Sequence, residues 1–176
     1  MENLILGTVT IFVLLITYMA LTEMWNFLQT RVPFVPTSKE DLVDLVDRVG
    51  ITEKDFVLDL GSGNGKVLFT IEKETGAKTM GIQRAGWTQV YGKLRKFLTG
   101  SKTKLISGNF FDHSWSEATI VYGYLYPFLM SQVGEKALGD CRSGTKIISR
   151  DFPIPNLKLY QTWETPTFHQ MYLYII

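Results

Sequence analysis

A buried-strand pattern that ends in an acid and runs directly into a glycine-rich turn constrains this chain more than any other feature. The run is Phe56-Val57-Leu58-Asp59-Leu60-Gly61-Ser62-Gly63-Asn64-Gly65-Lys66-Val67. Glycine lets the backbone turn tightly and approach a ligand with no Cβ in the way. Asp59 stands where the strand ends, and in open α/β sheets the crevice beyond the carboxyl ends of the strands is the usual ligand site. We therefore predict a ligand-binding turn here, rather than a tight turn with no ligand.

Three kinds of nucleotide-binding loop compete for this run. The dinucleotide fingerprint G-x-G-x-x-G fails because Lys66 stands where the last glycine should be. The P-loop pattern fails because Leu60 and Val67 occupy the positions of its first glycine and its hydroxyl residue. What remains, h-h-D-h-G-x-G-x-G, resembles motif I of the class I S-adenosylmethionine (SAM) methyltransferases. The chemistry agrees, because SAM has an α-amino group that an acid can hold and has no phosphate for a lysine to bind.

The bulk composition argues against several other classes. A net charge of +1 disfavours a nucleic-acid binder that works through phosphate contacts. The single cysteine, Cys141, excludes an internal disulfide framework and a cysteine-rich metal site. His113 and His169 are too far apart to show the spacing of metal ligands. We expect no nucleic acid and no metal, in a chain whose 176 residues leave room for one domain of ordinary size.

The N-terminal segment is a candidate membrane anchor. From Asn3 to Thr22 about 20 residues carry no charge, enough for a helix to cross a hydrocarbon core. Tyr18 and Trp25 lie near its end, where amphipathic rings favour the interface. A cleaved signal peptide fits less well, because it needs a basic start and a small-residue cleavage site. We predict a retained single-pass transmembrane anchor over residues 1–24.

The residues that follow the anchor indicate its orientation and reach. Arg31 and Lys39 come after the span and no basic residue precedes it, which places the following domain on the cytoplasmic side. Residues 25–37 form a juxtamembrane link with a proline-containing end. This link is too short to let the domain move far, so we expect the substrate at or near the membrane.

Downstream, the domain predicted over residues 38–176 alternates strand and helix and ends in a pair of strands. Thr37-x-x-Glu40 reads as a capping box for a helix that Gly50 ends. Later helices are predicted over 65–75, over a segment that contains residues 87–98 and is closed by Gly100, and over roughly 128–138. The third of these four helices has an apolar stripe at helical spacing, made of Trp87, Val90, Tyr91, Leu94, Phe97 and Leu98. Strands are predicted over 56–60, 79–83, 104–107, 118–125, 146–151, 157–164 and 168–175. This order predicts an α/β fold: a Rossmann-like, mostly parallel sheet with an antiparallel C-terminal edge.

Further motifs extend the resemblance over nearly all of residues 32–176. They are Val32-Pro33-Phe34-Val35-Pro36-Thr37, Gly108-Asn109-Phe110-Phe111, Ala118-Thr119-Ile120-Val121, Gly144-Thr145-Lys146-Ile147-Ile148-Ser149 and Met171-Tyr172-Leu173-Tyr174. With motif I, they resemble a family of small class I protein-lysine methyltransferases. That family includes an archaeal protein-lysine methyltransferase and the mitochondrial enzymes that modify the ATP synthase c-subunit or the adenine nucleotide translocase. The resemblance implies a class I methyltransferase fold, SAM as cofactor and a lysine-bearing protein as partner.

The resemblance also implies roles for particular residues. The acid and glycines of motif I hold the methionine end of SAM, Asn109 and Phe110 lie beside the adenine, and the segment ending at Thr37 covers the cofactor and helps form a lysine channel. From proline spacing alone, the same segment reads as a stiff linker. The cofactor-binding residues implied are Pro36, Thr37, Asp59, Gly61, Ser62, Gly63, Asn64, Gly65, Gln83, Asn109 and Phe110.

One position departs from the superfamily pattern. Class I methyltransferases usually end the second strand with an acid that accepts hydrogen bonds from both ribose hydroxyls, and here Gln83 stands at that place. A glutamine carbonyl accepts, but its NH2 group only donates. Losing one charge-assisted hydrogen bond costs roughly 1–2 kcal/mol, or about tenfold in SAM affinity.

The segment Tyr122-Gly123-Tyr124-Leu125-Tyr126-Pro127 ends the fourth predicted strand, next to the expected point of methyl transfer. Alternation places the three tyrosines on one face, where their rings can hold an ammonium group by cation–π attraction. Ordinary aromatic packing explains the same pattern, and both interpretations stay open. Tyr124 and Tyr126 are our candidate catalytic residues.

Together these observations predict a membrane-anchored, SAM-dependent protein-lysine N-methyltransferase. Catalysis in such an enzyme is mostly the in-line positioning of a neutral amine. Two alternatives remain. The first is a SAM-dependent methyltransferase of a lipid or quinone. The second, supported only by Gln83, is a catalytically degenerate interaction module tethered to the membrane.

Overall fold

One seven-stranded sheet organises the computed structural model, which describes residues 1–30, 37–84 and 86–176. The strand order is β3-β2-β1-β4-β5-β7-β6. The strands are β1 (Phe56–Leu60), β2 (Lys78–Gln83), β3 (Lys104–Ser107), β4 (Ile120–Gly123), β5 (Lys146–Arg150), β6 (Leu159–Glu164) and β7 (Gln170–Ile175). The first five pair in parallel, and β7 is antiparallel to both β5 and β6. The predicted α/β fold, with its antiparallel C-terminal edge, is confirmed.

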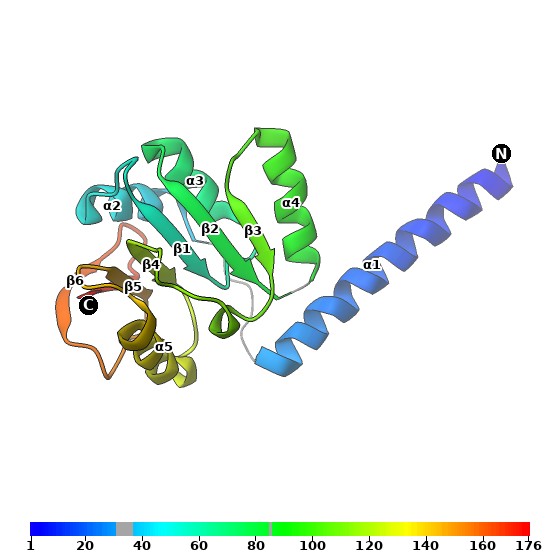
Figure 1. The fold of residues 1–176 in the computed structure, drawn as a ribbon. Helices are drawn as coiled ribbons and strands as arrows, with labels where there is room; N and C mark the ends of the chain where they lie inside the picture. The colour runs from blue at the N-terminus through cyan, green and yellow to red at the C-terminus, as the bar shows by residue number, and fades with distance from the viewer. Residues whose placement is uncertain (31–36, 85) are drawn as a thin grey trace.

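Helices cover both faces of this sheet (Figure 1). On one face, α2 (Lys39–Val49) and α3 (Lys66–Thr75) bury an apolar core with side chains of the central strands. On the other face, α5 (Pro127–Asp140) packs over a second core, together with Trp115. The crossovers between parallel strands therefore place the carboxyl ends of β1, β2, β3 and β4 at one edge of the sheet, where the glycine-rich turn lies.

Two local predictions are corrected by the structure. The predicted fourth strand ended at Leu125, whereas β4 ends at Gly123, because Tyr126 is the N-cap residue of α5 and Pro127 opens that helix. The predicted capping box began at Thr37, whereas Ser38 caps α2 and its side chain accepts a hydrogen bond from the Asp41 amide at 3.1 Å. Thr37 is instead buried, with its hydroxyl 3.5 Å from that of Tyr122.

Helix α4 (Trp87–Thr99) forms as predicted, but its apolar stripe points away from the sheet. The buried residues of this helix are Thr88, Gln89 and Gly92, and the helix contacts the edge strand β3. A small or polar inward face lets the helix lie close to the glycine-rich turn, since a Cβ on Gly92 would come within 3.1 Å of the Asn64 backbone. The apolar face is left in contact with solvent.

Helix α1 (Glu2–Thr30) projects from the domain as one long rod (Figure 1). It continues through the first residues of the predicted link. Within it, Glu2–Thr22 is long and apolar enough to cross a membrane, and no part of the most apolar window is buried. Length and composition alone make this span a candidate.

Candidate functional site

The glycine-rich turn after β1 has the backbone geometry of a ligand cradle. Gly61, Gly63 and Gly65 have φ values of 78°, 53° and 75°, which lie in the left-handed region that favours glycine. The amides of Gly61 and Gly63 are directed toward β2: the first donates to the Ile82 carbonyl at 2.9 Å and the second to Gln83 Oε1 at 3.2 Å. These bonds hold the turn against the end of β2.

Two side chains of the turn serve its own geometry. Asn64 Oδ1 accepts a hydrogen bond from the Lys66 amide at 3.2 Å and so helps to begin α3. Ser62 is buried, and its carbonyl accepts from the Gly65 amide at 2.8 Å. Both residues were predicted to bind the cofactor, and the structure places them in the wall of the cradle.

The closeness of packing at Gly65 leads to a prediction. A Cβ on Gly65 would come within 2.8 Å of the Phe69 ring and would also be strained by the positive φ. We expect Gly65→Ala to lower the free energy of unfolding by about 2–3 kcal/mol and to weaken SAM binding. Gly100→Ala is the matched control, because Gly100 has φ +65° with open space around it, and it should cost only about 1 kcal/mol. Equal losses in denaturant titrations of the two variants would contradict the role of the Phe69 contact.

Asp59 is the buried acid of the site. It lies at the carboxyl end of β1, is 3% exposed, and is paired in register with Tyr122 of β4. Burial raises the pKa of Asp59 to about 7. A cationic group beside the carboxyl would offset that burial and favour the ionised form. The residues therefore fit the α-amino group of SAM, which is the group predicted to bind here.

The ends of β2 and β3 lie beside the glycine-rich turn. The backbone carbonyl of Gln83 accepts from the Gly108 amide at 3.0 Å, which ties β2 to the loop after β3. In that loop Asn109 caps the short helix η1 (Phe110–Asp112), and its side chain accepts from the Phe111 amide at 3.3 Å. The Phe110 and Phe111 rings pack with centroids 4.5 Å apart. Gln83, Asn109 and Phe110 thus belong to the same edge of the sheet as Asp59.

Of the three tyrosines at the end of β4, Tyr122 and Tyr124 pack with the same core, whereas Tyr126 does not. Tyr122 is 1% exposed inside the core beneath α2, and burial raises its pKa to about 12. Tyr124 has the Arg150 guanidinium over its ring, 5.0 Å from the centroid, and the His169 ring at its edge. Tyr126 packs against Phe152 instead. The predicted shared face therefore holds for Tyr122 and Tyr124 and is wrong for Tyr126, because β4 ends at Gly123 and Tyr126 is already the N-cap residue of α5.

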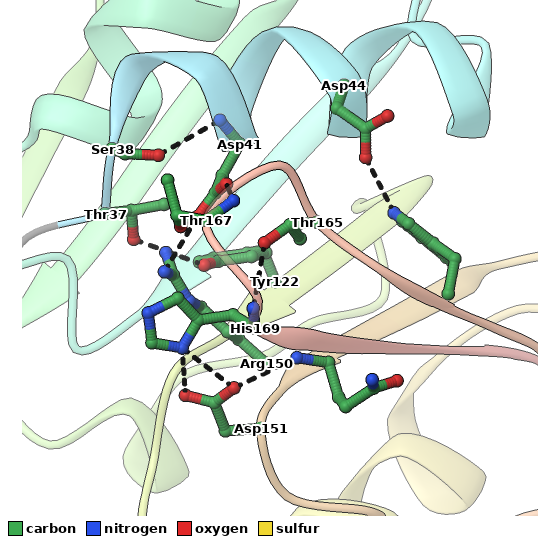
Figure 2. Close-up of polar contacts among 12 residues, drawn as sticks. Thr37, Ser38, Asp41, Asp44, Tyr122, Arg150, Asp151, Thr165, Thr167 and His169 are labelled. Carbon is green, nitrogen blue, oxygen red and sulfur yellow. Dashed lines mark hydrogen bonds and ion pairs between the residues drawn. The ribbon is translucent and has the colours of Figure 1, made fainter.

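A buried polar network next to these tyrosines was not predicted (Figure 2). Arg150 donates to Asp41 at 2.8 Å, with both side chains almost fully buried. Asp41 also accepts from the Thr167 amide at 3.1 Å and from its hydroxyl at 2.6 Å. Burial alone would raise the pKa of Asp41, but its hydrogen bonds outweigh burial and lower that pKa. The network joins α2, the end of β5 and the β6–β7 turn, and α2 is more than 100 residues from the other two in the chain.

A second acid extends the network toward Tyr124. Asp151 follows β5 with a φ of 63°, and its carboxylate lies 2.9 Å from His169 Nδ1. The same carboxylate accepts from the Gln170 amide at 3.2 Å. Sequence periodicity had no signal for any of these groups, because each depends on a contact between distant segments.

The proline-containing segment meets this region at its last residue. Thr37 lies against the buried Tyr122, with the two hydroxyl oxygens 3.5 Å apart, and its predicted role as part of a cover over the cofactor stays a prediction. Pro36, the other cofactor residue predicted in the segment, lies outside the described residues. A groove of about 520 Å³ between α3 and α4 is lined by none of the predicted site residues.

Comparison with known proteins places this site in a family. The model of the ANTKMT methyltransferase domain matches residues 59–161, from the acid of the turn to β6. A protein-lysine N-methyltransferase from Saccharolobus islandicus is 25% identical over 152 residues, which are 83% of this chain and 94% of that protein. The ATP synthase c-subunit lysine N-methyltransferase of Xenopus laevis is 28% identical over 130 residues. Those residues are 70% of this chain and 55% of the Xenopus protein, so the chain spans about half of that relative.

Solved structures show the same fold. An RNA methyltransferase from Salinibacter ruber, crystallised with S-adenosyl-L-homocysteine, superposes with a TM-score of 0.76 at 24% identity. The match covers 81% of this chain and 94% of that one. A SAM-dependent methyltransferase from Aquifex aeolicus superposes with a TM-score of 0.62 at 14% identity, over 77% of this chain and 89% of that one.

Proposed function

This chain belongs to the ANTKMT methyltransferase domain family, and on that premise we propose that it is a membrane-anchored, SAM-dependent protein-lysine N-methyltransferase whose substrate is a membrane-associated protein. The observation that carries the proposal is the buried Asp59 at the carboxyl end of β1, directly before three glycines with positive φ. An acid held there by the fold suits the α-amino group of SAM. The names of the lysine methyltransferases to which the chain is similar support lysine as the acceptor.

The residues of the site have a limited chemical task in this proposal. SAM supplies an activated methyl group, so the protein needs to orient the cofactor, exclude water and present a neutral amine. Asp59, the glycine turn and Gln83 would hold the cofactor, with Asn109 and Phe110 at its adenine end. The aromatic surroundings of Tyr124 and Tyr126 would lower the pKa of an entering lysine by desolvation and so favour its neutral form. Each ring already has a neighbour: the Arg150 guanidinium lies over Tyr124, and Phe152 stacks against Tyr126.

Membrane anchoring is proposed from α1. Its span Glu2–Thr22 is apolar and exposed, and only residues 31–36 separate the end of the helix from Thr37 at the site. Arg31 and Lys39 after the span favour a cytoplasmic domain. A domain tied so closely to a bilayer would encounter lysines of membrane proteins near the surface.

The test is transfer of an isotope-labelled methyl group by the full chain in lipid vesicles to membrane proteins of its own host. The proposal predicts labelled methyl-lysine, identified by mass spectrometry in the membrane-protein fraction and not in the soluble one. Label extracted with the lipids would indicate the lipid or quinone alternative. Failure of the folded chain to bind SAM in calorimetry would indicate an interaction module.

Gln83 yields a separate prediction for SAM affinity. Its Oε1 already accepts from the Gly63 amide, so a carboxylate in its place would keep that bond and add a second oxygen for a ribose hydroxyl. We expect Gln83→Glu to tighten SAM binding by about tenfold in calorimetric titration. Gln83→Met, which loses the acceptor of the turn, should weaken it. A Gln83→Glu variant that binds SAM no better than the parent would show that this side chain does not face the ribose.

A further inference from the structure

We propose that the outward face of α4 is a membrane-docking surface that rests on an anionic lipid bilayer. The α4 apolar face consists of large side chains that are each between 42 and 83% exposed: Val90, Tyr91, Leu94, Phe97 and Leu98. Soluble proteins rarely place a continuous apolar stripe of this kind in water. An amphipathic helix with an apolar side and flanking basic residues is the usual means of lying in the interfacial plane of a membrane.

The orientation of α4 is determined by its packing. Gly92 contacts the Asn64 backbone, and Gln89 accepts a hydrogen bond from Ser107 at 2.7 Å. On the same inward side, the Arg95 guanidinium lies over the Phe69 ring of α3, 5.5 Å from its centroid. Rotating the helix to bury its apolar face would break these contacts and push large side chains against the glycine-rich turn. The fold therefore presents the apolar face outward.

The charge of the surrounding segment suits an anionic lipid surface. Residues 75–111 contain no aspartate or glutamate, and they contain seven of the 18 basic residues of the chain: Lys78, Arg84, Lys93, Arg95, Lys96, Lys102 and Lys104. The Arg95 and Lys78 side chains lie over the Phe69 and Phe56 rings, so the attraction to lipid is assigned to the other five. Basic residues near a membrane are each attracted to anionic headgroups. At the start of the helix, the Trp87 and Tyr91 rings pack with centroids 5.3 Å apart, and such rings favour the interface.

The position of α1 indicates that a lipid bilayer, and not another protein, covers the α4 apolar face. The exposed helix α1 contacts α4, and α4 lies on the side of the domain from which α1 projects (Figure 1). Once Glu2–Thr22 spans a membrane, the eight helical residues that remain in α1 cover only about 12 Å. The α4 apolar face then lies within reach of the lipid surface, while a second copy of the chain would have to displace lipid to cover it.

Two attachments would orient the domain as well as tether it. Asn64 of the cofactor turn packs directly on α4, so a docked α4 would hold the carboxyl edge of the sheet close to the membrane surface. Lysines of membrane proteins that lie within about one domain radius of the bilayer surface would then be within reach of the site. This inference rests on the proposed anchoring by α1, but it does not depend on methyl transfer.

The test measures the depth of α4 in the bilayer by spin labelling. The full chain with Cys141→Ser receives one cysteine, at Leu94→Cys or Phe97→Cys, and is reconstituted in vesicles of phosphatidylcholine with or without phosphatidylglycerol. The matched control is Leu138→Cys, an exposed position of α5 over the other face of the sheet. In anionic vesicles we expect the α4 labels to lose collisions with a water-soluble nickel chelate and to gain collisions with oxygen, while the α5 label stays aqueous.

Each contrary result has a distinct meaning. Aqueous α4 labels on a chain that floats with the vesicles would overturn docking and leave anchoring by α1 intact. A chain that does not float would overturn both membrane proposals, whatever its methyltransferase activity. Labels shielded equally in detergent, on a species of dimeric mass, would assign the face to a second copy and overturn the lipid assignment.

Discussion

Replacing Asp59 with Asn is expected to weaken SAM binding by about 100-fold, or roughly 3 kcal/mol, because it removes the carboxylate proposed to hold the α-amino group. The same substitution is expected to stabilise the SAM-free protein. Burial raises the pKa of Asp59 to about 7, so the folded state disfavours the ionised carboxyl. If Asp59 holds the α-amino group as proposed, the protein keeps this charge for binding at a cost in stability. Calorimetric titration of SAM and denaturant unfolding, both on the full chain in detergent, measure the two effects.

The pH dependence of the Asp59 effect has a defined sign. The pKa of Asp59 is about 7 in the folded protein and about 3.8 in the unfolded chain. Between these values the folded state binds more protons, so the free energy of unfolding falls as pH rises through this window. Above pH 7 the full cost of about 4 kcal/mol is present, and Asp59→Asn should recover much of it there and nothing below pH 4.

SAM binding to the parent protein should follow the same ionisation. Affinity rises as pH increases toward 7 and levels off above it, and the Asn variant should lose this dependence. Asp47→Asn is the matched control, because Asp47 is exposed on α2 and its replacement should change neither SAM affinity nor stability by much. A destabilised Asp59→Asn variant that still binds SAM tightly would contradict the assignment of Asp59.

Replacing Asp41 with Asn is expected to lower the free energy of unfolding by about 3–5 kcal/mol. The guanidinium of Arg150 is 2% exposed and pairs with Asp41, while its Nε and Nη1 atoms have no hydrogen-bond partner among the residues that the structure describes. Losing the carboxylate charge would leave a buried cation without compensation. The effect should be visible in denaturant titration, and SAM affinity should fall only as far as the fraction of folded protein does.

The control for Asp41 is an ion pair of the same helix that faces solvent. Arg48 donates to Asp44 at 2.7 Å, but its side chain is 45% exposed. Arg48→Met should therefore change stability by at most about 1 kcal/mol. If Asp41→Asn proved no more harmful than Arg48→Met, the buried pair would not be what ties α2 to the end of β5.

Much of the fold was predictable because its signals are local. The strand Phe56–Leu60 was predicted residue for residue, and α4 was predicted from its apolar stripe and its stop at Gly100, since a buried run, a stripe at helical spacing and a terminal glycine each depend only on near neighbours. The predicted cofactor residues of motif I fall at one edge of the sheet for the same reason. Errors arose where a contact between distant segments replaces a local one. The Thr37 hydroxyl lies next to that of Tyr122, so Ser38, and not Thr37, caps α2.

The amino-acid sequence by itself determined the α/β order of elements, the acid-and-glycine turn and the apolar N-terminal span. Each of these depends on backbone preferences and hydrophobic periodicity, which are properties of consecutive residues. Only the tertiary structure decided which groups meet. These are the pair of Asp41 with Arg150, the packing of Tyr126 against Phe152 and away from the other two tyrosines, and the outward direction of the α4 apolar face. Periodicity reports that a helix has an apolar side, but the close packing of Gly92 on Asn64 determines the direction in which that side points.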